Sequence, residues 1–130
     1  MSTRPAFAAT PALGFGAVST ANTNRDGTGT IVDVLTAGAS GAKVEQLVLK
    51  ATGDPADSVV TIFLDTGGGY KLYDEFDLGN PAAASTTDVG YRVTKAYDDL
   101  VLPAGAKLGA AITVALTSGV INVWAHGGHY

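Results

Sequence analysis

Cysteine is absent from this sequence. Disulfide bonds and thiolate metal sites are therefore excluded, and the chain is compatible with synthesis in a reducing cytosol. An apolar run of about 18 residues is also missing, so we expect no transmembrane helix and no membrane partner. The first five residues contain no apolar stretch of the kind that a signal peptide needs.

Basic residues are scarce and scattered. There are 8 Lys and Arg residues against 12 Asp and Glu residues, which gives a formal net charge of −4. Nucleic-acid-binding domains usually carry a basic patch or stripe. No nucleic-acid partner is therefore expected.

Recognisable catalytic motifs are missing as well. The strained G-x-S-x-G turn of serine hydrolases does not occur. The glycine runs at residues 67–69 and 127–128 do not lead into a helix, as phosphate-binding loops do. The acidic pairs at positions 75 and 77 and at 98 and 99 are more typical of solvated strand residues than of a glycosidase pair. The sequence predicts no enzyme, no catalytic residue and no cofactor.

One stretch has the spacing of a calcium loop. Asn22, Asn24, Asp26 and Asp33 fall at positions 1, 3, 5 and 12 of an EF-hand pattern. However, position 1 is a neutral Asn, position 12 is Asp rather than a bidentate Glu, and no flanking helix is visible. Because Asn, Asp and Gly are also ordinary turn residues, a turn is the preferred interpretation and no metal site is predicted.

The histidines lie close together near the end of the sequence. His126 and His129 are three residues apart, a spacing that can hold a stray transition metal. A zinc site needs three or four ligands with a defined shell, and no cysteine is available to complete one. We therefore expect residues 126–130 to form a solvated tail.

Glycine, alanine, valine and threonine are abundant, whereas Glu and Lys are few. This balance favours strands and turns over surface helices. A chain of 130 residues is long enough for one domain that buries roughly two-thirds of its unfolded surface. Strand-like runs recur about every ten residues, which predicts an all-β, antiparallel β-sandwich of seven to nine strands.

The closing segment, residues 98–130, is predicted to form an antiparallel meander of three strands. The first ends at Pro103, which has no N–H for a ladder. The second begins at Lys107 and is expected to continue to about Thr117, with a turn at Ser118-Gly119 before the third strand at 120–125. Its small-residue face (Gly109, Ala111, Thr113, Ala115) permits close approach by another backbone, or lies under the second sheet.

Other strands are expected at residues 30–36, 43–51, 59–64, 70–78 and 91–97. The apolar pattern of 43–51 changes phase near Glu45, which a bulge explains. Residues 59–64 are apolar on both faces, as in the middle of a sandwich. In 70–78, Tyr70, Leu72, Phe76 and Leu78 are expected to share a face, and Asp74 on that face indicates a bulge or a sheet edge.

Residues 1–27 are predicted to be an extended arm preceding a sandwich domain at residues 28–130, with a short strand around 16–20 as an option. Phe7, Leu13 and Phe15 are costly to leave in water. They either pack on the domain's own surface or dock on a neighbouring subunit. Both alternatives stay open at this point, and these three are the candidate partner-binding residues.

Residues 100–108 (LVLPAGAKL), followed by a strand of alternating apolar residues, resemble the late strands of small jelly-roll domains in virion proteins. Residues 21–32, the 38–41 turn and the 43–50 strand are similar to a group of small tailed-bacteriophage structural proteins found among head and tail genes. The resemblance implies a jelly-roll-like sandwich that decorates a capsid or forms an accessory tail component, often using an extended arm. It carries no catalytic residues.

The sequence thus leads to a non-enzymatic virion structural protein that binds and stabilises a phage capsid as a decoration protein. Its expected partners are the major capsid protein or other virion subunits and further copies of itself, with a trimer as the specific expectation, assembled in the host cytoplasm. One alternative is a tail or baseplate component. Another is a carbohydrate- or receptor-binding module that uses exposed aromatic residues, for which the candidates are Tyr70, Tyr73, Tyr91, Tyr97, Trp124 and Tyr130.

Overall fold

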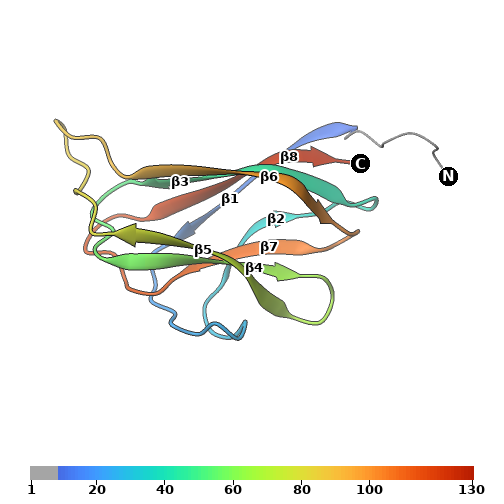
Figure 1. Cartoon of the computed structure of the whole chain (residues 1–130), viewed down its shortest axis with the longest axis horizontal. Helices are drawn as coiled ribbons and strands as arrows, with labels where there is room; N and C mark the ends of the chain where they lie inside the picture. The colour runs from blue at the N-terminus through green and yellow to red at the C-terminus, as the bar shows by residue number, and fades with distance from the viewer. Residues whose placement is uncertain (1–8) are drawn as a thin grey trace.

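The computed structural model describes residues 9–130, which form eight strands in two four-stranded antiparallel sheets (Figure 1). Within this range no helix is long and apolar enough to cross a membrane. The strands are β1 (Thr10–Val18), β2 (Val32–Thr36), β3 (Ala42–Ala51), β4 (Ser58–Asp65), β5 (Tyr70–Gly79), β6 (Arg92–Leu102), β7 (Lys107–Ile112) and β8 (Ile121–His129).

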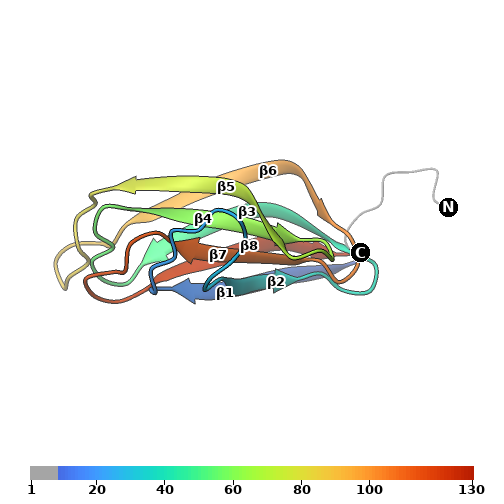
Figure 2. The ribbon, with the colours of Figure 1, turned by 90° about the horizontal axis from the view of Figure 1, so that it is seen from below.

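The strand order defines a jelly roll. One sheet has the order β1-β8-β3-β6 and the other β2-β7-β4-β5, so that β1 pairs with β8, β2 with β7, β3 with β6 and β4 with β5. The first half of the chain therefore pairs with the second half, as in a long hairpin rolled into two layers. Figure 2 shows the two layers closing on each other, with β5 and β6 along one side and β1 and β2 along the other. The predicted sandwich and its strand count are confirmed.

The core lies between the sheets and is filled by the inward residues of both. Leu47 and Leu49 of β3, Val60 and Ile62 of β4, and Leu108 of β7 have no exposed surface. The bulge predicted near Glu45 is present as a register shift between Val44 and Gln46. It keeps both halves of β3 directed into the core, because one extra residue restores the two-residue alternation.

The predicted meander is wrong. β6 and β7 lie in different sheets, and β8 returns to the first sheet beside β1 and β3. Leu100 and Leu102 are buried while Val101 is exposed, and β6 ends before Pro103 as expected. Alternating apolar residues and turn residues predict where strands begin and end. They do not show whether the next strand pairs in the same sheet or crosses to the other sheet. Among residues 9–130, the one pair of consecutive strands that also pair with each other is β4 and β5, joined by the predicted hairpin loop.

Two further boundaries differ from expectation. β7 ends at Ile112 rather than near residue 117, because Thr113 turns to exchange hydrogen bonds with Val59 through its N–H and its hydroxyl. Residues 126–129 are not a tail. They continue β8, pairing with β1 on one side and β3 on the other, and the His129 ring accepts a hydrogen bond from the N–H of Gly38.

The strand predicted to carry four apolar residues on one face is divided by a bulge. The register of β5 against β4 shifts between Leu72 and Asp74, so Phe76 and Leu78 enter the core while Tyr70 and Leu72 face the other way. The expectation that all four share a face is therefore wrong. The bulge and the edge position that Asp74 indicated are both present.

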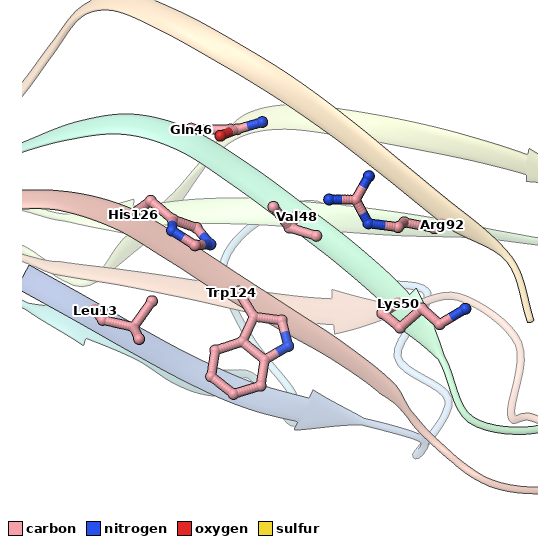
Figure 3. A pocket seen from close by; sticks show the side chains of 7 residues that line it. All are labelled: Leu13, Gln46, Val48, Lys50, Arg92, Trp124 and His126. Atoms are coloured by element: carbon pink, nitrogen blue, oxygen red, sulfur yellow. The ribbon is translucent and has the colours of Figure 1, made fainter.

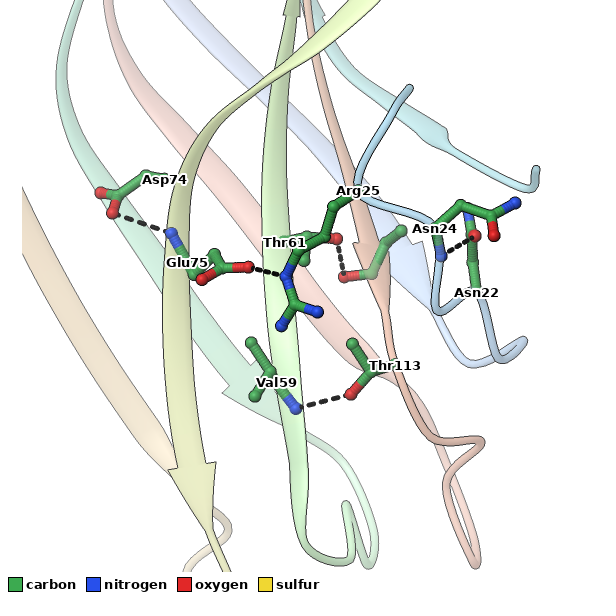
Figure 4. Close-up of polar contacts among 9 residues, drawn as sticks. Asn22, Asn24, Arg25, Val59, Thr61, Asp74, Glu75 and Thr113 are labelled. Carbon is green, nitrogen blue, oxygen red and sulfur yellow. Dashed lines mark hydrogen bonds and ion pairs between the residues drawn. The ribbon is translucent and has the colours of Figure 1, made fainter. Parts of the chain in front are cut away.

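The outer face of the β2-β7-β4-β5 sheet is covered by residues 21–31, the connection between β1 and β2. Ala21 bridges to Ile112, Arg25 pairs with Glu75, and Asn22 supports Asn24 (Figure 4). Gly109 lies under this connection, where an added Cβ would be 2.7 Å from Ile31. The ring of Tyr70 also lies 2.9 Å from this Cβ position, so the small-residue face at Gly109 is contacted by side chains of the same chain.

Candidate functional site

The outer face of the other sheet carries large apolar side chains. Strand register places Phe15, Trp124 and Val48 in one row across β1, β8 and β3, with Leu13 in the next row. Successive residues of a strand point to opposite faces, so these four side chains lie on the face turned away from the core. We call Leu13, Phe15, Val48 and Trp124 the apolar face.

Leu13 and Phe15 are 61% and 57% exposed. The ring of Phe15 lies 4.8 Å from that of Trp124, at an interplanar angle of 30°. This contact orders both aromatic side chains without removing Phe15 from water. Exposed apolar side chains that form a contiguous patch on one sheet are typical of an interaction surface.

A shallow depression of about 540 Å³ lies on this face. Leu13, Val48 and Trp124 form part of its lining, and Gln46, Lys50, Arg92 and His126 complete it (Figure 3). Figure 3 shows the guanidinium of Arg92 turned toward Val48, with Lys50 extending away from it. Apolar groups thus form the centre and polar groups the rim, as in many protein interfaces.

The rim is cationic. Lys50 and Arg92 are direct cross-strand neighbours on β3 and β6. The amino group of Lys50 donates a hydrogen bond of 2.8 Å to the carbonyl oxygen of Gly90. Neither Lys50 nor Arg92 forms an ion pair with a carboxylate within residues 9–130.

Asp74, which the sequence pattern places among apolar residues, has a structural role. It joins the two edge strands β5 and β6 by accepting hydrogen bonds from Lys95 Nζ (2.6 Å) and Tyr97 Oη (2.7 Å). Burial alone would raise the pKa of Asp74, but these two hydrogen bonds outweigh it and hold the pKa below its usual range. Burial and the hydrogen bond to Asp74 raise the pKa of Tyr97. At neutral pH, Asp74, Lys95 and Tyr97 therefore form a polar link between the two sheets, which we call the brace.

The residues with the spacing of a calcium loop, which begin at Asn22, form a turn, as expected. The side-chain amide of Asn22 is buried and donates to the carbonyl oxygens of Thr28 (3.0 Å) and Thr30 (2.9 Å). Its oxygen accepts the N–H of Asn24. Asp33 lies outside this turn and binds the hydroxyl of Tyr70. Within residues 9–130 no group of three or more His, Cys, Asp or Glu side chains is arranged to hold a metal ion.

The aromatic residues considered for sugar binding do not form one platform. Tyr70 packs edge-on to Phe63, and the ring of Tyr73 lies 6.0 Å from that of Tyr97. Burial and the hydrogen bond to Asp33 raise the pKa of Tyr70. Of the six candidates, Trp124 alone lines the depression on the apolar face.

The candidate partner-binding residues have different outcomes. Phe7 lies outside the described residues. Leu13 and Phe15 lie on β1, which is hydrogen-bonded to β8 along its whole length, so residues 10–18 belong to the sandwich and not to an arm preceding it. The sandwich therefore begins before residue 28. Sequence reasoning missed Val48, Lys50 and Arg92, which come next to β1 residues only through the β1-β8-β3-β6 order.

Fold and site together define an eight-stranded jelly roll with an exposed apolar sheet face. No protein-family model matches the sequence, and a comparison with curated proteins gives no match. The fold is similar to a chain of the acidic stable capsid structure of Helicobacter pylori bacteriophage KHP30, with a TM-score of 0.57 and 13% identity over 92% of this chain and 86% of that chain. At this identity the likeness shows a shared fold.

A second similar chain comes from the structure of infectious bursal disease virus Gx strain. The match covers 98% of this chain and 34% of that chain, at 13% identity and a TM-score of 0.34. Because this TM-score is low, the second likeness carries no argument.

Proposed function

We propose that this chain is a non-enzymatic virion structural protein that binds and stabilises a phage capsid as a decoration protein, acting as a homo-oligomer and specifically a trimer. The observation that carries the proposal is the exposure of Leu13 and Phe15 on β1, a strand that pairs with β8 along its whole length. The likeness of the fold to a chain of a phage capsid structure supports the same assignment.

The mechanism follows from where the apolar face lies. Leu13 and Phe15 are held by the β1–β8 ladder, so docking them costs little backbone entropy. If the partner surface exists only on the assembled shell, Leu13 and Phe15 are covered only when the protein binds that shell. Binding the assembled state and not the free subunits stabilises the assembly by mass action. Rigid aromatic anchors such as Phe15 and Trp124 are the residue types that dominate binding energy in interfaces.

The test is co-sedimentation with empty heads of the phage that encodes the chain. We expect the wild-type protein to sediment with heads in a fixed ratio and to raise their thermal stability. The double substitution Leu13→Ser and Phe15→Ser should abolish co-sedimentation while the domain remains folded. The matched control is Val114→Ser, since this valine is also exposed but lies in the loop that follows β7 of the other sheet.

Equal binding by the double variant would contradict a role for the apolar face. Wild-type protein that ignores heads but sediments with tails would favour a tail or baseplate component. The mass of the protein in solution tests the oligomer separately, because a monomer at all concentrations contradicts the trimer.

A carbohydrate-binding module is the second candidate, because Trp124 lines a depression that also contains a Gln amide and an Arg guanidinium. Aromatic rings and planar polar groups of this kind bind sugars. Glycan binding by the isolated protein, lost in Trp124→Ala and retained in Tyr73→Ala, would support this candidate.

A further inference from the structure

We propose that the apolar face docks a protein surface that carries carboxylates beside an apolar side chain. The apolar side chain enters the depression, and the carboxylates pair with Lys50 and Arg92. This inference rests on the proposed function and deepens it by stating the chemistry of the shell partner.

Charge on the depression differs from that of the whole chain. Acidic residues outnumber basic ones by 12 to 8 in the whole chain. The lining of the depression reverses this balance, since it contains Lys50, Arg92 and His126 and no carboxylate. Complementary potentials across an interface set partner choice and the rate of encounter.

The two cations of the rim, Lys50 and Arg92, lie directly opposite each other in the sheet. Lys50 and Arg92 are paired directly across β3 and β6, and like charges in this position destabilise a sheet. Of the five other cations within residues 9–130, Arg25, Lys95 and Lys107 have a carboxylate partner and Lys43 and Lys71 have none, so what distinguishes Lys50 and Arg92 is their direct cross-strand pairing. Lys50 and Arg92 are therefore neighbouring cations with which carboxylates of a partner protein could pair.

The shape of the site favours a protein over the other possible occupants. The depression is shallow and is continuous with Phe15, so apolar contact extends beyond it. A sugar in the depression could bind Gln46, Lys50, Arg92 and His126, but it would leave the exposed Phe15 beside the depression uncovered. A second copy docking through the same face would bring like cationic rims into one interface, which is unfavourable.

Arg92→Glu is the informative substitution, because Arg92 is exposed and Lys50 also holds the Gly90 carbonyl oxygen. We would measure binding of the full-length protein to empty heads at about 50 and 200 mM salt, a range over which screening of exposed charges increases. Arg92→Glu should weaken binding by at least about tenfold and reduce its salt dependence. Arg92→Lys should restore most of the binding.

Lys71→Glu is the matched control, since it makes the same charge change on an exposed β5 residue of the other sheet. Its binding should stay within about twofold of wild type. Thermal unfolding of each variant reports folding. Arg92→Glu should unfold at the same or a higher temperature than wild type, because it replaces a like-charge pair by an opposite-charge pair.

Unchanged binding of Arg92→Glu with an unchanged salt response would overturn the inference and leave the proposed function intact. A wild-type protein that does not bind heads would overturn both. Loss of the solution oligomer in Arg92→Glu without loss of head binding would identify a second copy as the occupant. Inhibition of head binding by an acidic oligosaccharide, such as an oligouronate, would identify a glycan instead.

Discussion

Asp74 is expected to hold the open side of the sandwich together. β5 and β6 are edge strands of different sheets, and no backbone ladder within residues 9–130 joins them. The carboxylate of Asp74 bridges the gap by accepting hydrogen bonds from Lys95 and Tyr97. We therefore expect Asp74→Ala to destabilise the domain more than a substitution at an ordinary edge residue.

The magnitude follows from the exposure of the three partners. The side chain of Asp74 is 19% exposed and that of Lys95 is 47% exposed, so the ion pair is partly screened and contributes about 0.2–1 kcal/mol. The bond from the half-buried Tyr97 hydroxyl to a charged acceptor contributes about 1.5–3 kcal/mol when its partner is removed. Asp74→Ala should then lower the free energy of unfolding by about 2–3 kcal/mol, or the melting temperature by about 7–11 °C for a domain of this size.

The assay is chemical unfolding of wild type, Asp74→Ala, Tyr97→Phe and the double variant, followed across pH. The double-mutant cycle should give a coupling of at least about 0.5 kcal/mol between Asp74 and Tyr97. Asp74→Asn removes the charge of the side chain but keeps its shape, so it shows how much of the stabilisation depends on the charge. Because the pKa of Asp74 is lowered on folding, its stabilisation is present above the unfolded pKa of about 3.9 and disappears as pH falls through the folded pKa.

The stability difference between wild type and Asp74→Asn should therefore shrink as the pH is lowered below about 4. A melting temperature of Asp74→Ala within about 2 °C of wild type would refute the brace. If the stability difference between wild type and Asp74→Asn grows as the pH is lowered, the pKa of Asp74 is not lowered on folding.

Two further substitutions test the connection that covers the second sheet. Gly109→Ala should cost about 1–3 kcal/mol in unfolding experiments, because the added Cβ would be 2.7 Å from Ile31. Gly68→Ala, with no heavy atom within 4 Å and no positive φ, is the neutral control. Asn22→Ala should cost about 1–3 kcal/mol by leaving two loop carbonyls unpaired, and should speed amide hydrogen exchange at Asn24; unchanged exchange there would contradict this role.

Local signals in the sequence predicted local structure well. The phase change near Glu45 marked a real bulge, and the doubly apolar run at 59–64 became β4, with Phe63 buried on the side opposite Ile62. These features depend on the two-residue alternation of a strand and on turn residues, both of which are written in short stretches. The hairpin between β4 and β5 was predicted for the same reason.

Pairing between distant strands was not predictable in this way. Residues 126–129 looked like a tail because they contain two glycines and two histidines. They form a strand because β1 and β3 lie on either side, and Gly127 lies where the backbone of β3 comes too close for a Cβ. That requirement comes from a residue more than eighty positions away, Lys43, and no window around residue 127 contains it.

The same limit applies to β1, which the sequence analysis assigns to an arm. Its large residues, Leu13 and Phe15, alternate with small ones, Ala12, Gly14 and Gly16, so the period of two is present. The pattern is inverted, because the small residues face β2, where a Cβ at Gly16 would be 2.7 Å from Val32, and the large ones face water. Single exposed apolar residues are common, but a contiguous exposed patch such as the one that contains Leu13 and Phe15 is typical of an interaction surface. The inverted pattern is the observation behind the proposed partner, and it can be detected in the sequence once residues 10–18 are recognised as a strand.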